Sequence, residues 1–225
     1  MLVMNWMSKP VITVDANDSM QNGMKLLREH DIKMLPVMEK GKLVGVVTDR
    51  DVKRSSASDA TTLEIHELLF LVSKIKVNEI MTKDPITVPS DYTIEETAQV
   101  LLENNISGVP VMDKKKVVGV ITQADIFRVL ISLTGIGKRG IQFAFHLEDH
   151  PGSIKEVGDI FRRYGGRMVS ILSSYERVPE GDRNVYIRAY GIERPKLRKL
   201  KDELGEKATL VYMIDHRKKK REIYE

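Results

Sequence analysis

The sequence predicts an α+β protein in which two copies of a β-α-β-β-α unit are followed by one β-α-β-β-α-β unit. Two observations predict this organisation. The phrase LVGVVTDRDV at 43–52 returns as VVGVITQADI at 117–126, and after residue 140 the apolar residues follow a different order of elements. The chain has 225 residues, of which 42% are hydrophobic, and this is enough for more than one buried core.

The two phrases belong to a duplicated segment. A constant offset of 74 residues, the difference between Met7 and Met81, also relates Asp51 to Asp125 without a gap. About 19 of about 48 aligned positions are identical, which is typical of an internal repeat. A single unit of this size leaves one sheet face uncovered, so we expect the two copies to pack as a pair.

Each copy carries the same series of local signals. In the first copy, residues 12–14 predict a short strand and residues 15–32 carry the apolar spacing of a helix. The polar stretch EKGK then separates MLPVM from LVGVV, which indicates a hairpin. The proline in MLPVM suits the entry or the edge of a strand. Another helix is expected after Thr48, and the second copy repeats this order.

The third unit begins after the glycine-rich stretch that ends at residue 140. A strand is predicted by alternating apolar residues and a helix by apolar residues at helical spacing. These are Ile141, Phe143, Phe145 and Leu147 for the strand, and Ile154, Val157, Phe161 and Tyr164 for the helix. Two strands, a charged helix over 192–208 and a last strand over 209–215 follow. The order β-α-β-β-α-β is the ferredoxin-like arrangement.

Composition excludes several function classes. The chain has no cysteine, which excludes disulfides, thiolate metal sites and thiol nucleophiles. A basic region followed by a long apolar stretch is absent from the N-terminus, and no apolar run is long enough to span a membrane, so we expect a soluble, cytoplasmic protein. His146 and His150 need not share a face, and no P-loop or nucleophile-base pair is present. We therefore predict no catalytic residue, no catalytic cofactor and no metal.

The formal net charge of +4 is modest, and much of it lies in the C-terminal stretch HRKKKRE. Such a stretch can contact nucleic acid or an acidic surface. The alternative is a basic terminus that is simply solvated, and the sequence favours that reading because no DNA-binding fold accompanies the stretch.

Two motifs recur at matching spacing in both copies. One is an apolar residue followed by Pro-Val, and the other is Gly-x-x-Thr-x-x-Asp. On these motifs, residues 1–134 resemble the tandem CBS domain pair, or Bateman module. The resemblance implies that the chain binds an adenosine-containing effector, either an adenine nucleotide (AMP, ADP or ATP) or another adenosyl ligand.

The motif residues have a chemistry that suits such a ligand. An aspartate three residues after a threonine, at a helix start, can accept hydrogen bonds from a ribose diol, and the helix N-terminus adds partial positive charge. The adenine would lie between the first strand and the Pro-Val segment. The predicted nucleotide-binding residues are Ile12, Thr13, Pro36, Val37, Thr48, Arg50 and Asp51 in the first copy, and Ile86, Thr87, Pro110, Val111, Thr122 and Asp125 in the second. Alternatively, or in addition, each threonine is an N-cap and each aspartate favours the helix dipole.

The two copies differ between the threonine and the aspartate. The first copy has Asp49-Arg50 and the second has Gln123-Ala124. Because arginine can pair with a phosphate, the first site is better equipped for a charged nucleotide. Arg50 is alternatively a surface ion-pair partner.

The loop after the first strand of the third unit carries Asp-x-Pro-Gly. On this motif and the order of its elements, the unit resembles the ACT domain, a regulatory module that often binds amino acids. Backbone amides at the helix start could hold a ligand carboxylate, although an ordinary turn has the same pattern. The candidate amino-acid-binding residues are Asp149, Pro151, Gly152 and Ser153. A purely dimerising or relaying role is the alternative.

The predicted boundaries are as follows. CBS repeat 1 covers 1–60, an amphipathic linker helix 61–80, CBS repeat 2 81–134, the ACT-like domain 140–216 and the basic tail 217–225. This architecture resembles the acetoin utilisation family, whose members are assigned regulatory roles in acetoin or acetate metabolism.

We therefore predict a non-enzymatic sensor that forms a homodimer. Its partners would be a small-molecule effector and a regulated protein, with no membrane and no nucleic acid. The competing functions are an enzyme that uses scattered carboxylates and a nucleic-acid regulator that uses the basic tail.

Overall fold

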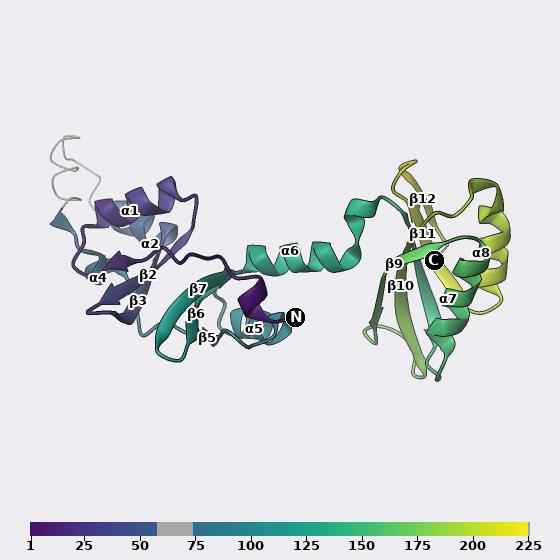
Figure 1. The fold of residues 1–225 in the computed structure, drawn as a ribbon, viewed down its shortest axis with the longest axis horizontal. Coiled ribbons are helices and arrows are strands. Elements are labelled where there is room, and N and C mark those ends of the chain that lie inside the picture. The colour runs from purple at the N-terminus through teal and green to yellow at the C-terminus, as the bar shows by residue number, and fades with distance from the viewer. Residues whose placement is uncertain (58–73, 225) are drawn as a thin grey trace. The chain divides into compact units, whose positions relative to one another are not determined.

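The structure is a computed structural model that describes residues 1–57 and 74–224. These residues belong to two compact units, Met1–Phe127 and Arg128–Glu225, whose elements are labelled in Figure 1. Most of the linker helix expected at 61–80 lies outside the described residues. The described end of that range is not one continuous helix, because Ile75 and Lys76 are not helical and α4 (Val77–Ile80) follows as a separate helix of four residues.

Both copies have the predicted β-α-β-β-α order. The first copy consists of β1 (Val14–Asp15), α1 (Met20–Glu29), β2 (Met34–Glu39), β3 (Lys42–Thr48) and α2 (Asp49–Ala57). The second consists of β5 (Val88–Pro89), α5 (Ile94–Glu103), β6 (Gly108–Asp113), β7 (Lys116–Thr122) and α6 (Gln123–Thr134). Strands β3 and β7 contact each other, so the two copies pack as a pair, as the duplication predicts.

The proline of each hairpin lies at a position where its missing N–H leaves no neighbouring strand unpaired. Strand β2 lies between β1 and β3 in the sheet, although a proline favours an edge strand. However, β1 is short and pairs with β2 only at Val37 and Met38. Pro36, one residue earlier, is paired on the β3 side alone, with Val46. The strand is therefore an edge at the proline, and Pro110 has the same position in the second hairpin.

Each copy is completed by the segment that precedes the other copy. Val77 of α4 is fully buried in the core of the first copy, and its N–H donates to the Asp18 carbonyl at 2.9 Å. Strand β4 (Thr82–Lys83) then pairs with β3. In the same way η1 (Val3–Asn5) joins the second copy, where the Val3 N–H donates to the Tyr92 carbonyl at 2.8 Å. The duplication therefore produces a reciprocal exchange of segments.

This exchange explains the glycine inside each hairpin strand. A Cβ atom on Gly45 would lie 2.5 Å from the Met81 sulfur and 2.8 Å from the Thr82 carbonyl oxygen. A Cβ atom on Gly119 would lie 2.5 Å from the Met7 sulfur. Glycine is required because the exchanged segment approaches the strand closely. This contact accounts for the glycine of the Gly-x-x-Thr-x-x-Asp motif without a ligand.

The second unit has the predicted β-α-β-β-α-β order and one additional strand. Its elements are η2 (Ile136–Lys138), β8 (Ile141–Glu148), α7 (Ser153–Arg163), β9 (Arg167–Ser174), β10 (Asp182–Tyr190), η3 (Arg194–Lys196), α8 (Leu197–Gly205), β11 (Thr209–Asp215) and β12 (Lys220–Ile223). The sheet is antiparallel, with the order β12-β11-β8-β10-β9.

Helices α7 and α8 lie on the same side of this sheet (Figure 1). The core between them and the sheet contains Phe143, Phe145 and Phe161, whose side chains are at most 1% exposed. The Phe143 and Phe161 rings meet edge to face, with centroids 5.0 Å apart. The alternation of apolar residues along β8 thus assigns one sheet face to the helices, as expected for an α+β layer.

The C-terminal stretch differs from the expected basic tail. Residues 220–223 form β12 and pair with β11, with Tyr212 opposite Ile223. The Lys201 ammonium donates to the Glu222 carboxylate at 2.8 Å. Hydrogen bonds from Lys201, Lys220 and Tyr224 lower the pKa of Glu222 to about 2. This ion pair anchors the strand to α8, so the second part of the stretch belongs to the sheet, and residues 216–219 form the turn that leads into it.

Candidate functional site

The first copy brings its predicted site residues to one end of a sheet. Strand β1 runs parallel to β2 with Val14 opposite Val37, so Thr13 lies beside Pro36. Strand β3 runs antiparallel to β2 with Thr48 opposite Met34. The residues before β1, the start of β2 and the end of β3 therefore meet at the same end, which agrees with the predicted grouping.

The second copy repeats this arrangement with greater exposure. Val88 lies opposite Val111 and Gly108 lies opposite Thr122. Ile86 is 41% exposed, whereas its equivalent Ile12 is partly buried. The segment before the first strand is thus more open to solvent in the second copy.

The start of α2 is held by a reciprocal pair of hydrogen bonds. The Thr48 N–H and the Thr48 hydroxyl donate to Oδ2 of Asp51 at 2.9 and 2.6 Å. The Asp51 N–H points back to the Thr48 hydroxyl oxygen at 3.4 Å. This geometry is a capping box with aspartate in the N3 position.

The start of α6 has the same geometry. Oδ2 of Asp125 accepts from the Thr122 N–H at 2.9 Å and from the Thr122 hydroxyl at 2.7 Å. Asp125 is only 4% exposed, whereas Asp51 is partly exposed. The capping role proposed for the threonine and aspartate is confirmed in both copies, and it leaves open an additional role towards a ligand.

The Pro-Val pairs contribute to the core through their side chains. Val37 and Val111 are fully buried, and Pro36 and Pro110 are also buried. A ligand could therefore contact these positions only through the main chain, and this is the contact expected for reading an adenine edge.

Arg50 lies in the first turn of α2, and its side chain is exposed. The carboxylate of neighbouring Asp49 pairs with Lys53 at 3.2 Å, so the ion pair of this turn uses Lys53 and not Arg50. One surface hollow lies along α1. It is lined by Ser19, Gln21, Asn22, Met24, Lys25, Arg28 and Glu29, none of which is a predicted site residue.

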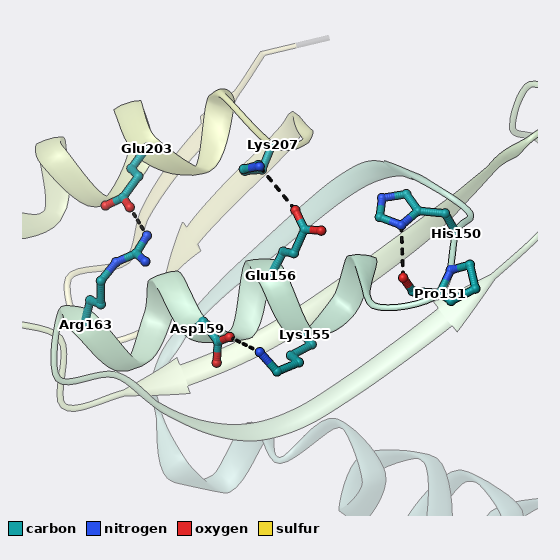
Figure 2. Close-up of polar contacts among 8 residues, drawn as sticks. All are labelled: His150, Pro151, Lys155, Glu156, Asp159, Arg163, Glu203 and Lys207. Atoms are coloured by element: carbon teal, nitrogen blue, oxygen red, sulfur yellow. Dashed lines mark hydrogen bonds and ion pairs between the residues drawn. The ribbon is translucent and has the colours of Figure 1, made fainter.

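The Asp-x-Pro-Gly loop of the second unit forms the start of α7. Gly152 has a φ angle of +97°, which favours glycine, and Ser153 is buried. The Ser153 N–H donates to the His150 carbonyl at 3.2 Å. In Figure 2 the His150 ring turns towards the Pro151 carbonyl, at a distance of 3.2 Å from Nδ1 to the oxygen.

An arginine that the sequence did not indicate contacts this loop. Arg183 of β10 donates from Nη2 to the Ser153 hydroxyl at 2.9 Å, and its Nε lies 3.4 Å from Oδ1 of Asp149. The antiparallel pairing of β10 with β8 brings Arg183 there, since it lies opposite Leu147 near the end of β8. Only knowledge of this pairing could have predicted the contact.

Ion pairs connect the exposed side of α7 to the α8 region (Figure 2). Glu156 pairs with Lys207 at 3.3 Å, and Arg163 pairs with Glu203. Within α7 the Lys155 ammonium donates to Asp159 at 2.7 Å. Exposed pairs of this kind contribute about 0–1 kcal/mol each to stability. This side of α7 is therefore an ordinary solvated helix surface, and its ion pairs give no indication of a ligand.

Two further findings concern metals and membranes. Across the ranges 1–57 and 74–224, no three or more histidine, aspartate or glutamate side chains come together in a group that could hold a metal ion. In the same part of the chain, none of the helices combines the length and the apolar composition that crossing a bilayer requires.

Comparisons with known proteins agree with the duplication. The family model of the CBS domain matches residues 3–58 and 77–132. A CBS domain-containing protein of Dictyostelium discoideum is 31% identical over 134 residues, which cover 59% of this chain and 92% of that protein. The L-aspartate semialdehyde sulfurtransferase of Methanocaldococcus jannaschii is 38% identical over 130 residues, or 57% of this chain. The match spans only 23% of that enzyme.

Solved structures give the same result. The CBS domain pair of protein MJ0100, crystallised in complex with 5′-methylthioadenosine and S-adenosyl-L-methionine, is 36% identical. It aligns with a TM-score of 0.50 over 58% of this chain and 95% of that chain. A Vibrio cholerae protein assigned to acetoin utilization (AcuB) shares the fold, with 23% identity and a TM-score of 0.51 over 61% of this chain and 96% of its own. The family match ends at residue 132, so the ACT resemblance remains a prediction.

Proposed function

Because the chain belongs to the CBS-domain family, we propose that it is a regulatory protein that binds an adenosine-containing ligand in its repeat pair. One observation carries this proposal. The chain is 36% identical to a CBS domain pair crystallised with 5′-methylthioadenosine and S-adenosyl-L-methionine, and it spans 95% of that pair. In this proposal, ligand binding shifts the packing of the pair, and the second unit transmits or integrates the change.

The capped helix starts are the proposed ribose sites. Asp51 uses Oδ2 for both bonds from Thr48, so its other oxygen, Oδ1, can accept a ribose hydroxyl. The Thr48 hydroxyl already donates to Asp51 and can therefore act only as an acceptor towards a ligand. Capping thus fixes the orientation of both groups before a ligand arrives, which reduces the entropy cost of binding.

We further propose that the two sites prefer different ligands. The exposed Arg50 would pair with a phosphate at the first site. Ala124 provides no charge at the equivalent place, so the second site is better suited to an adenosyl ligand without phosphate.

The assignments beyond the repeat pair belong to the same proposal. The unit at 140–216 is an ACT-like domain that binds an amino acid at the Asp149–Ser153 loop or serves dimerisation, and a role in acetoin or acetate metabolism is the proposed setting. A homodimer is supported by exposed apolar side chains on the first unit. Leu102 is 76% and Phe127 is 60% exposed, and such surfaces often mark protein contacts.

A thermal-shift panel tests the proposed function. The full chain is heated with 5′-methylthioadenosine, S-adenosylmethionine, AMP, ADP, ATP and the free amino acids, and GTP serves as the matched control for ATP. A ligand at 100 times its Kd adds about 2.7 kcal/mol to the free energy of unfolding, so the melting temperature should rise with an adenosine compound and not with GTP. The absence of a shift with every adenosine compound at millimolar concentration would refute the proposal.

A further inference from the structure

A buried arginine lies on the sheet face of the second unit that α7 and α8 do not cover. Arg188 of β10 stands between Ile187 and Ala189, which are fully buried in the core below the helices. Since successive side chains of a strand point to opposite faces, Arg188 points to the other face. It is nevertheless only 3% exposed.

Part of the Arg188 guanidinium has hydrogen-bond partners. Its Nε donates to the Thr134 carbonyl at 2.7 Å, and its Nη2 donates to Oε1 of Gln142 at 2.8 Å. The Gln142 amide in turn donates to the Tyr212 hydroxyl at 3.2 Å. The third nitrogen, Nη1, is buried and has no hydrogen-bond partner.

The positive charge of Arg188 is also not balanced locally. Over the part of the chain that the structure describes, no carboxylate forms an ion pair with it. Burial lowers the pKa of Arg188, but a guanidinium remains protonated in proteins. Leaving a buried charge without a counterion is strongly destabilising, and a buried polar group without a partner often indicates an ion or a water that completes the site.

A second buried nitrogen without a partner lies in the same region. Nε2 of His216, the residue after β11, is buried and lacks a hydrogen-bond partner. Burial, and after it the charges of Arg188 and Arg221, lower the pKa of His216, so the neutral ring can donate one N–H. The neighbouring Asp215 is occupied, since its carboxylate pairs with Arg194 at 2.5 Å and accepts from the Arg217 N–H at 3.0 Å.

The surrounding surface is cationic. Five exposed basic residues follow His216: the turn carries Arg217, Lys218 and Lys219, and β12 begins with Lys220 and Arg221. The His216 N–H donates to the Gly140 carbonyl at 3.3 Å, which brings the exposed Lys138 and Arg139 to the same end of the sheet. A cluster of one sign of charge attracts oppositely charged ligands.

We propose that this unit binds a small oxyanion, a carboxylate or a phosphate group, between Nη1 of Arg188 and Nε2 of His216. One oxyanion would accept from both donors and would balance the charge of Arg188. This position is separate from the Asp149–Ser153 loop, because Gln142 lies at the start of β8 whereas Asp149 follows its end. It also requires no adenosine, so the inference stands apart from the proposed function of the repeat pair.

The test uses the full chain and two probes, inorganic phosphate and acetate, each titrated against sodium chloride at equal ionic strength. Binding is followed by the melting temperature and by the NMR signals of the His216 ring. We expect saturable binding of at least one probe with a shift of the His216 signals. Binding of phosphate alone would identify a phosphate-bearing ligand, and binding of acetate alone would identify a carboxylate.

Three variants locate the binding. His216→Phe keeps a ring at this position and should weaken the affinity at least tenfold, and Arg188→Met should abolish binding. The control Lys219→Gln removes an exposed charge from the same turn and should change the affinity far less than either of these two variants. The proposal is overturned if neither probe binds saturably, or if His216→Phe binds as tightly as the unsubstituted chain. The His216→Phe result decides the matter even if Arg188→Met does not fold.

Discussion

The two CBS copies have nearly the same cap geometry and different residues inside the cap. The hydroxyl-to-carboxylate distance is 2.6 Å in the first copy and 2.7 Å in the second, and the N–H-to-carboxylate distance is 2.9 Å in both. The two intervening residues are Asp49-Arg50 in one copy and Gln123-Ala124 in the other. The threonine and the aspartate thus satisfy a requirement of folding, whereas the cap does not fix the residues between them, and these carry the proposed difference in ligand preference.

A second difference lies in the burial of the cap. Asp125 is 4% exposed, whereas Asp51 is partly exposed. The cap of the second copy is therefore more closely coupled to the core, and that of the first copy is more accessible to a ligand. The predictions below test this division, beginning with the largest expected effect.

The reciprocal exchange of segments predicts which copy loses stability when a buried residue of an exchanged segment is substituted. Val3→Asp and Val77→Asp each place a charge at a fully buried position, and each should lower the free energy of unfolding by at least about 3 kcal/mol. Hydrogen exchange should accelerate in β5–β7 for Val3→Asp and in β1–β3 for Val77→Asp. Acceleration confined to the copy in which each residue lies by sequence would contradict the exchange.

The strand glycines should tolerate substitution unequally. The new Cβ atom of Gly45→Ala would meet the Thr82 carbonyl oxygen at 2.8 Å, and that of Gly119→Ala would meet the Ser8 carbonyl oxygen at 3.0 Å. Since overpacking costs about 1–3 kcal/mol, both variants should be destabilised in urea denaturation, Gly45→Ala more than Gly119→Ala. The model of a close backbone approach fails if both variants are as stable as the parent.

Removal of the cap hydroxyl should have the smallest effect. An N-cap threonine replaced by alanine costs about 0.5–2 kcal/mol. Thr122→Ala should lie at the upper end, because it leaves the buried Asp125 with fewer donors, and Thr48→Ala should lie at the lower end. Thr48→Ser and Thr122→Ser serve as controls and should restore most of the stability. Equal losses at both positions would show that the difference in burial has no energetic consequence.

The sequence predicts the regular parts of this structure well. The constant offset and the hairpin turns locate both copies, and the alternation along β8 identifies the strand that begins the second unit. These predictions succeed because each depends on local periodicity.

Features that depend on tertiary pairing were missed. The exchanged strand β4 has two residues, which is too short for a periodic signal. Nothing in the sequence of β10 indicates that Arg188 is buried beside the Thr134 carbonyl and Gln142. The sequence favours a solvated tail at β12, because the lysine, arginine and glutamate of this strand give no apolar pattern that would indicate its pairing with β11. The contact of Arg183 with the Asp149–Ser153 loop likewise depends on strand register.

The most direct test of the central claim is calorimetric titration of Asp51→Asn and Asp125→Asn with ATP and with 5′-methylthioadenosine. If Asp51 accepts a ribose hydroxyl, its loss should cost about 1.5–3 kcal/mol of binding free energy, or roughly tenfold to more than a hundredfold in Kd. Because Arg50 has no equivalent at Ala124, ATP binding should be weakened more by Asp51→Asn than by Asp125→Asn. Unchanged affinity for both ligands in both variants would reduce the two aspartates to helix caps, and a larger loss of ATP binding in Asp125→Asn would reverse the proposed difference between the sites.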